Sequence, residues 1–209
     1  MLHIIDNGIQ LTVMTGCGIY TAVLFIRSKN QAWFLLTCYY GAFTLGLIYW
    51  FLFLVFRSMT PQISSISDLN WLASLLFLLM LQKTIQLPGE GAYRPLWLWT
   101  IPVFCGVMCL YFFRWGDYFV NVLWAVLMGA CGYIALRGLL FAHHQTGAGR
   151  NHQYFHISVL AFILVEYCLW IASCIWDHIT LSNPYFWFDF LLSAVLFTFL
   201  PTLKKAVAE

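Results

Sequence analysis

Seven apolar stretches, each long enough to cross a lipid bilayer, follow one another along the 209-residue chain. A transmembrane helix needs about 20 mostly apolar residues, because the hydrocarbon core of a bilayer is about 30 Å thick. Lipid offers no partners to backbone N–H and C=O groups, so these stretches have to be helical. The predicted spans cover residues 9–26, 32–56, 65–82, 96–113, 118–142, 155–176 and 184–203.

The composition leaves no room for a separate soluble domain. Hydrophobic residues make up 62% of the chain and charged residues only 9%, which is far from the balance of a soluble globular protein. The connections between the spans are short, so residues 1–209 are predicted to form a single all-α transmembrane domain. The net charge is only +2 and contains no basic run, which argues against a nucleic acid as partner.

The basic residues predict how the bundle is oriented. Short cytoplasmic loops of membrane proteins are enriched in Lys and Arg. An outside N-terminus and a cytoplasmic C-terminus leave only Arg57 and Arg114 outside. The cytoplasmic side then receives Arg27, Lys29, Lys83, Arg94, Arg137, Arg150, Lys204 and Lys205. The short loops and compact size favour a bacterial cytoplasmic membrane, where the protein would be a multi-pass cell-membrane protein.

Glu166 is the acidic residue predicted to lie deepest in the bilayer. It falls about 16 Å into the span 155–176, near the membrane midplane. Ser173 and Asp177 share its helix face, which predicts a polar stripe facing the interior of the bundle. Intramembrane carboxylates commonly bind a ligand, an ion or a proton. The alternative is a neutral carboxyl, or an interhelical hydrogen bond that only fixes the packing.

Asp189 is predicted to lie close to this stripe. It falls about one and a half turns into the span 184–203, and a short connection favours antiparallel packing of the last two spans. The alternative is a carboxylate at headgroup level that reaches water. Asn121 is a further candidate because it lies one turn from Asp117. Asp117 itself is predicted to cap the helix 118–142.

Tryptophans are abundant in the half of the bundle that contains these carboxylates. Carboxylates surrounded by indoles suit an amine or quaternary ammonium ligand, through ion pairing and cation–π attraction. Trp170 is therefore included in the candidate site. The alternative is an interfacial aromatic belt, which serves only to anchor the protein. The tryptophans of this half are Trp50, Trp71, Trp115, Trp124, Trp170, Trp176 and Trp187.

No motif in the sequence predicts a metal, a cofactor or a catalytic constellation. The seven cysteines lie inside apolar stretches, where a thiol behaves as a small hydrophobe. Four histidines gather between the fifth and sixth spans, where we expect a hydrated loop instead of a rigid metal site. These histidines are His143, His144, His152 and His156.

The favoured hypothesis is an integral membrane sensor or ligand-binding module with an outward-opening polar and aromatic pocket. Glu166, Asp189 and the tryptophans would line this pocket and bind a small cationic or amine ligand. With no effector domain of its own, such a protein needs a cytoplasmic or membrane partner protein. Two alternatives stay open at this point: a transporter of a small or proton-coupled solute, and an intramembrane enzyme that modifies lipid. A structural subunit of a larger complex is a further alternative.

Overall fold

Seven long helices make up the protein in a computed structural model that describes residues 2–57, 61, 64–176 and 178–207. The described residues contain no strand, and the predicted all-α fold with seven spans is confirmed. The helices are α1 (Leu2–Ser28), α2 (Gln31–Arg57), α3 (Ser65–Thr84), α4 (Thr100–Phe112), α5 (Tyr118–His143), α6 (His152–Ile175) and α7 (Pro184–Ala206). Short 3₁₀ helices join them: η1 (Glu90–Ala92), η2 (Leu96–Trp99), η3 (Phe113–Trp115) and η4 (Gly147–Asn151).

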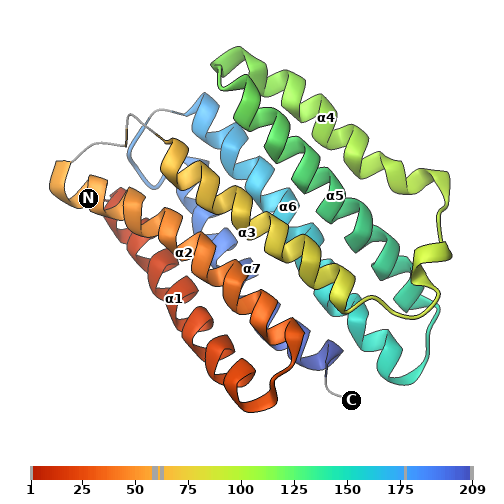
Figure 1. Ribbon diagram of the computed structural model, residues 1–209. Coiled ribbons are helices and arrows are strands. Elements are labelled where there is room, and N and C mark those ends of the chain that lie inside the picture. The colour runs from red at the N-terminus through yellow and green to blue at the C-terminus, as the bar shows by residue number, and fades with distance from the viewer. Residues whose placement is uncertain (1, 58–60, 62–63, 177, 208–209) are drawn as a thin grey trace.

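Six of the helices form a closed ring, and α4 lies outside it (Figure 1). Around the ring, α1 packs on α2, α2 on α3, α3 on α5, α5 on α6, α6 on α7, and α7 returns to α1. Among the long helices, only α5 has extensive contacts with α4. We call the end of the bundle where α1 begins the N end, and the opposite end, where α7 finishes, the C end.

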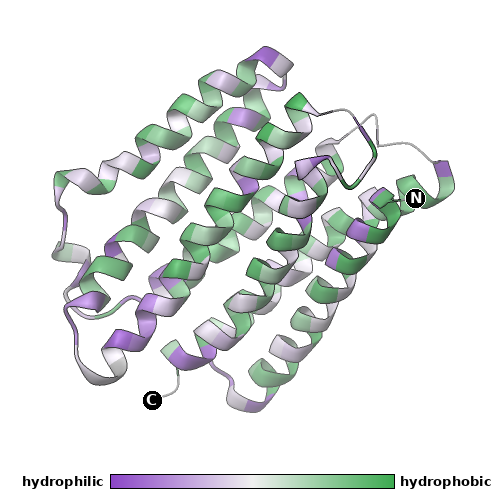
Figure 2. Cartoon of the chain, turned by 180° about the vertical axis from the view of Figure 1, so that it is seen from behind, coloured by the Kyte–Doolittle hydropathy of each residue, from purple (hydrophilic) through white to green (hydrophobic). Residues whose placement is uncertain are grey.

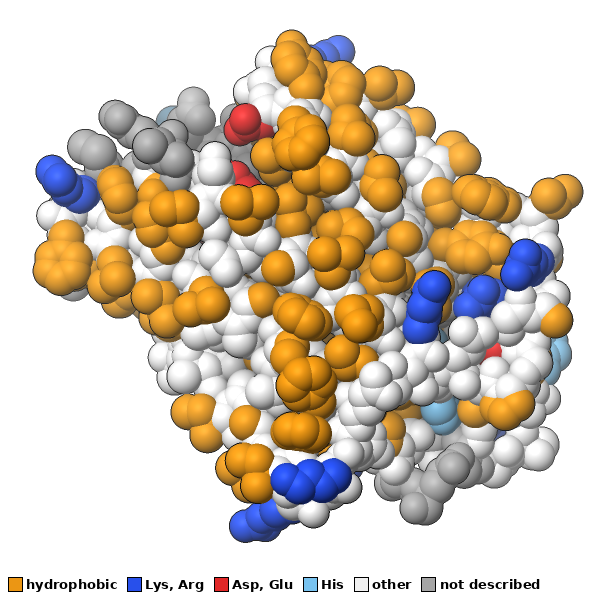
Figure 3. Space-filling view, in the orientation of Figure 1, with side chains coloured by type: hydrophobic (Ala, Val, Ile, Leu, Met, Phe, Trp, Pro, Cys, Tyr) orange, Lys and Arg blue, Asp and Glu red, His pale blue; other side chains and the backbone are white. Residues whose placement is uncertain are grey.

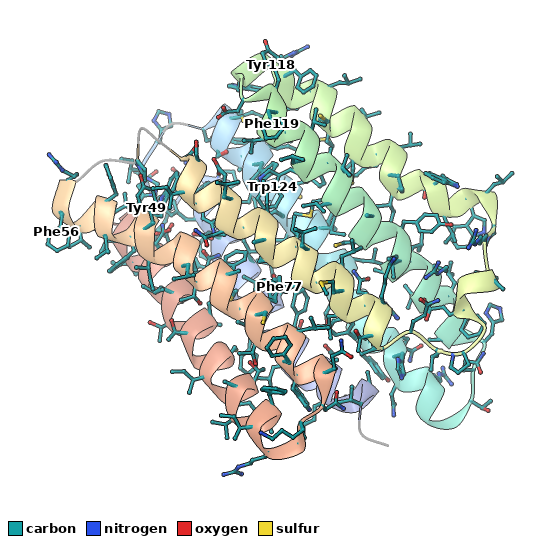
Figure 4. All side chains as sticks on the ribbon, viewed as in Figure 1. Tyr49, Phe56, Phe77, Tyr118, Phe119 and Trp124 are labelled. Atoms are coloured by element: carbon teal, nitrogen blue, oxygen red, sulfur yellow. The ribbon has the colours of Figure 1, made fainter. Side chains whose placement is uncertain are left out.

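The surface of the bundle is as apolar as its interior. Tyr39, Phe162 and Phe199 are completely buried, whereas Phe56 and Phe119 are largely exposed and point outward (Figure 4). Apolar residues cover most of the length of the helices, and hydrophilic residues are concentrated towards the helix ends (Figure 2). Exposed aromatic and aliphatic side chains on every face would be unstable in water. The protein is therefore a multi-pass integral membrane protein, while its orientation stays a prediction.

The first helix begins seven residues earlier than predicted. The predicted span starts at residue 9, after several polar residues, whereas α1 starts at Leu2. Asp6, Asn7 and Gln10 are buried in the ring instead of forming a polar leader. The other predicted spans differ from the observed helices by only a few residues at their ends.

Two of the helices begin in different ways. Asn183 caps the last helix: its Oδ1 accepts a hydrogen bond of 2.9 Å from the Tyr185 N–H, and Pro184 is the first helical residue. The predicted capping by Asp117 is wrong, because its side chain makes no capping bond. Asp117 has a positive φ of 48°, outside the extended backbone region that capping residues normally adopt.

The histidines between α5 and α6 do not form one hydrated loop. His143 and His144 are exposed at the end of α5, as expected for such a loop. His152 and His156 are instead buried in α6, which begins earlier than predicted. His156 packs against Gly138 of α5, where a β-carbon would collide with the imidazole ring. His156 is therefore part of the packing between α5 and α6.

Candidate functional site

A cavity of about 330 Å³ lies inside the ring at the N end. The first turns of α1 and α7, the start of α3, and the last turns of α2 and α6 surround it. The connection between α6 and α7 also lines it, and Asn183 fixes this connection by donating hydrogen bonds to the Trp176 and His178 carbonyls, at 3.2 Å and 2.8 Å. Four of the predicted site residues line this cavity: Glu166, Asp189, Trp170 and Ser173.

Glu166 enters the cavity from α6 as a buried carboxyl with few protein partners. Only 6% of the residue is exposed, and no described group donates a hydrogen bond to its Oε2 atom. The carboxyl does contact the indole of Trp170, one turn further along the helix. It lies nine residues from the end of α6, about 14 Å from the N end of the bundle. Buried acceptors without a donor are uncommon in proteins, and Glu166 is the less satisfied of the two acids that line the cavity.

Asp189 reaches the cavity from α7 and is held by α1. Gln10 donates a hydrogen bond of 3.0 Å from its Nε2 to Asp189 Oδ1. The carboxyl of Asp6 also faces that of Asp189 at hydrogen-bonding range. Asp6 is held in turn by Asn7, whose backbone N–H donates to Asp6 Oδ1 at 2.8 Å. The first three turns of α1 therefore supply the polar groups that fix Asp189.

The Asp6 and Asp189 carboxyls cannot both be ionised without repelling each other. Both side chains are almost completely buried, with 1% and 4% of the residues exposed. Two adjacent carboxylates are stable only when they share a proton or neutralise a bound cation. The pair can therefore hold one positive charge, either as a proton or as part of a ligand.

Aromatic side chains form much of the remaining wall. Trp50 and Trp71 pack with their ring centroids 5.9 Å apart, and Trp71 lies over Gly46, where a β-carbon would be 2.6 Å from its Nε1. Trp71 Nε1 is buried and donates to no described acceptor. Trp176 also lines the cavity. A cation in this cavity would meet carboxylates and indole faces together, which is a favourable combination.

The seven tryptophans of the N end divide into three groups. Trp50, Trp71, Trp170 and Trp176 line the cavity. Trp115 and Trp187 are exposed by 50% and 60%, as residues of an interfacial belt are. Trp124, labelled in Figure 4, is buried, and its ring packs edge-on against that of Trp170 with the centroids 4.7 Å apart.

Ser173 and Asn121 each donate a hydrogen bond to a nearby backbone carbonyl. Ser173 lines the cavity, but its hydroxyl donates to the Trp170 carbonyl at 2.8 Å. Asn121 lines a separate hollow of about 270 Å³ near Asp117, and its amide donates to the Gly116 carbonyl at 2.8 Å. Asp177 lies outside the described residues.

Sequence reasoning missed the contribution of α1 to this site. His3, Asn7 and Gln10 line the cavity, and Asp6 lies against Asp189. Their helical spacing contains a signal, because Asn7 and Gln10 are three residues apart and share a face. That signal becomes visible only when the polar start of the chain is treated as part of the span.

Buried carboxyls beside indole faces are groups that can hold a cation or a proton. Among the described residues, no group of three or more His, Cys, Asp and Glu side chains is placed to hold a metal ion. No Lys or Arg is among the described residues that line the cavity. No protein-family model matches this chain, and neither does any curated protein or solved structure.

Proposed function

We propose that the protein is a membrane ligand-binding module that takes a small organic cation into the cavity at the N end. The observation that carries this proposal is the buried Glu166 Oε2, which no described donor contacts, inside a cavity walled by tryptophans. Leaving a buried carboxylate without a partner costs several kcal/mol, so a cation that pairs with it would bind tightly.

The charge balance of the cavity favours a cation over an anion or a neutral molecule. Glu166 and Asp189 are its acidic lining residues, and His3 and His178 are the only ionisable nitrogen bases among its described lining residues. Asp6 adds a third carboxyl immediately behind Asp189. An alkylammonium or quaternary ammonium group would pair with these carboxyls and lie against the indole rings.

The size of the cavity limits the ligand to a small molecule. Ligand pockets range from about 300 to 1,000 Å³, so a cavity of about 330 Å³ is at the small end. An amine with a few carbon atoms would fit, whereas a peptide would not. In the orientation predicted from the basic residues, the cavity opens to the outside of the cell.

A sensor of this kind needs a second protein to read its state. The described residues form seven membrane helices with short connections, so the ligand would act by shifting their packing. A cytoplasmic or membrane partner would detect that shift at the C end. Proton-coupled transport is the second candidate, and the Asp6–Asp189 carboxyl pair is the observation that favours it, because such a pair can exchange a proton for a cation.

Tryptophan fluorescence in detergent tests the binding proposal. Choline is the probe, and 3,3-dimethylbutanol, its neutral isostere, is the control ligand. We expect choline to change the fluorescence saturably and the isostere to have no effect. Glu166→Gln should weaken choline binding at least tenfold, because truncating one member of a buried charge pair costs about 2 kcal/mol or more.

Asp68→Asn is the matched variant, because Asp68 is a carboxyl at the same end that does not line the cavity. It should bind choline as the wild type does. Equal responses to choline and its isostere, or undiminished binding by Glu166→Gln, would refute a cation site. Uptake of radiolabelled choline into proteoliposomes then separates the two candidates: a transporter moves choline across the membrane, and a sensor binds it without moving it.

A further inference from the structure

A second concave surface opens on the outside of the bundle, far from the cavity at the N end. It is a groove of about 770 Å³ between α3 and α4, with α5 as its floor. Leu79 and Lys83 of α3 form one wall, and Pro102 and Gly106 of α4 form the other. Because α4 packs on α5 and lies outside the ring, this groove faces the lipid.

The floor of the groove is apolar and built from small residues. Ala125, Gly129 and Ala130 of α5 lie there, opposite Gly106. A β-carbon on Gly106 would meet no protein atom within 4 Å, so the space beside it is open. The open space beside Gly106 is therefore the part of the groove that an acyl chain could occupy, whereas Gly129 is covered by Pro102 of α4.

The C-end part of the groove is basic. Lys83 and Arg94 are exposed there, and neither forms an ion pair with an acid among the described residues. Arg137 lies beside them, paired with the buried Glu90 at 3.5 Å between Nε and Oε1. Basic side chains are grouped next to the hydrophobic surface on this face of the molecule (Figure 3). One acid against three bases leaves this region electropositive.

The length of the groove matches one leaflet of a bilayer. Its lining on α5 runs from Ala125 to Arg137, a span of about 18 Å at 1.5 Å per residue. Half of the hydrocarbon thickness is about 15 Å. Trp99 and Tyr133 lie near the basic part, with ring centroids 5.4 Å apart, and such aromatic residues prefer the headgroup level.

We propose that this groove binds one anionic glycerophospholipid, with its phosphate at Lys83 and Arg94 and an acyl chain along α5. Basic pockets between transmembrane helices bind anionic headgroups in this way. A lipid here would also fill the space between α3 and α4, and so hold α4 against the ring.

Native mass spectrometry of the protein in a mild detergent tests this proposal. The probes are phosphatidylglycerol and phosphatidylcholine with the same palmitoyl and oleoyl chains. We expect the first phosphatidylglycerol to bind about tenfold more tightly than phosphatidylcholine. The double variant Lys83→Gln/Arg94→Gln should remove this preference, since each basic residue near the headgroups contributes on the order of fivefold. Choline binding at the N end should be unchanged in this variant.

Two leucine variants test the apolar half of the groove. Gly106→Leu should weaken the binding of both lipids several-fold, because the new side chain occupies the channel. Gly41→Leu on α2 is the matched control: its β-carbon also meets no protein atom, and Gly41 is exposed on another helix. It should bind both lipids as the wild type does.

Four results would overturn the proposal. One is equal binding of the two lipids by the wild type, and another is an unchanged lipid preference in the double variant. The third is a stable dimer that binds neither lipid, which would assign the groove to a second copy of the chain. Displacement of phosphatidylglycerol by glycerol 3-phosphate would likewise count against it, because that anion has no acyl chain to occupy the groove.

Discussion

The protein contains two buried glutamates at opposite ends of the bundle, and their surroundings differ. Glu90, at the C end, is completely buried, accepts a hydrogen bond from the Leu87 N–H at 3.2 Å, and pairs with Arg137. Glu166, towards the N end, has no cation beside it among the described residues and faces a cavity. The chain supplies Glu90 with one hydrogen bond and one cation, and the 3.5 Å contact with Arg137 is an ion pair and not a hydrogen bond. Among the described residues, Glu166 has no cation beside it and its Oε2 has no donor. We therefore propose a ligand-binding role for Glu166 and a structural role for Glu90.

The largest loss of stability should come from breaking the Glu90–Arg137 ion pair at the C end. Arg137→Gln leaves Glu90 buried without its cation, and breaking a buried ion pair costs about 3 kcal/mol. The loss should appear as a lower Tm in detergent at pH 8. The exposed Arg150 provides the control, because Arg150→Gln removes a cation that forms no ion pair among the described residues, and its Tm should stay close to that of the wild type.

The loss of stability caused by Arg137→Gln should depend on pH. Burial raises the pKa of the Glu90 carboxyl by more than Leu87 and Arg137 lower it. The contribution of this group to stability is therefore greatest below its unfolded pKa of about 4.3, and it is lost as the pH rises through the raised folded pKa. A protonated Glu90 needs no cation, so Arg137→Gln should cost less at pH 4 than at pH 8. An equal loss at both pH values would show that Arg137 acts through packing alone.

At the N end, we expect a gain in stability of intermediate size. Asp6→Asn should raise the Tm at pH 8 by the equivalent of about 1 kcal/mol, because an amide can donate a hydrogen bond to Asp189. The amide oxygen can still accept the Asn7 N–H bond that Asp6 Oδ1 accepts now. A fall in Tm would mean that the Asp6 and Asp189 carboxyls already stabilise each other and do not need a bound cation.

The smallest effect on stability should come from Glu166→Gln. Its Oε2 has no donor to lose, and the remaining amide oxygen can keep the contact with Trp170. We expect a Tm within the equivalent of about 0.5 kcal/mol of the wild type, measured without ligand. A loss as large as that of Arg137→Gln would remove the contrast between the two glutamates and make Glu166 a packing residue.

Apolar length was enough to predict the fold, because a span in lipid has few alternatives to a helix. Glu166 and Asp189 were found by the same logic, since a carboxyl inside an apolar stretch requires a reason. Asp6 and Gln10 were not predicted as site residues because they lie at the polar edge of the first span. Hydropathy there cannot distinguish a polar segment before the helix from a buried turn of the helix. The ion pair of Glu90 was not predicted because Glu90 follows Gly89 in a connection between helices. Only the folded chain shows that this connection lies against Arg137.

The hydrogen bond between Gln10 and Asp189 joins residues 179 positions apart, the first and last helices of the ring. During synthesis the cavity at the N end cannot exist until α7 has entered the membrane beside α1. A molecule bound there would therefore recognise only a chain in which α1 and α7 have come together. Under the proposed function, ligand binding would report that the ring of helices has closed.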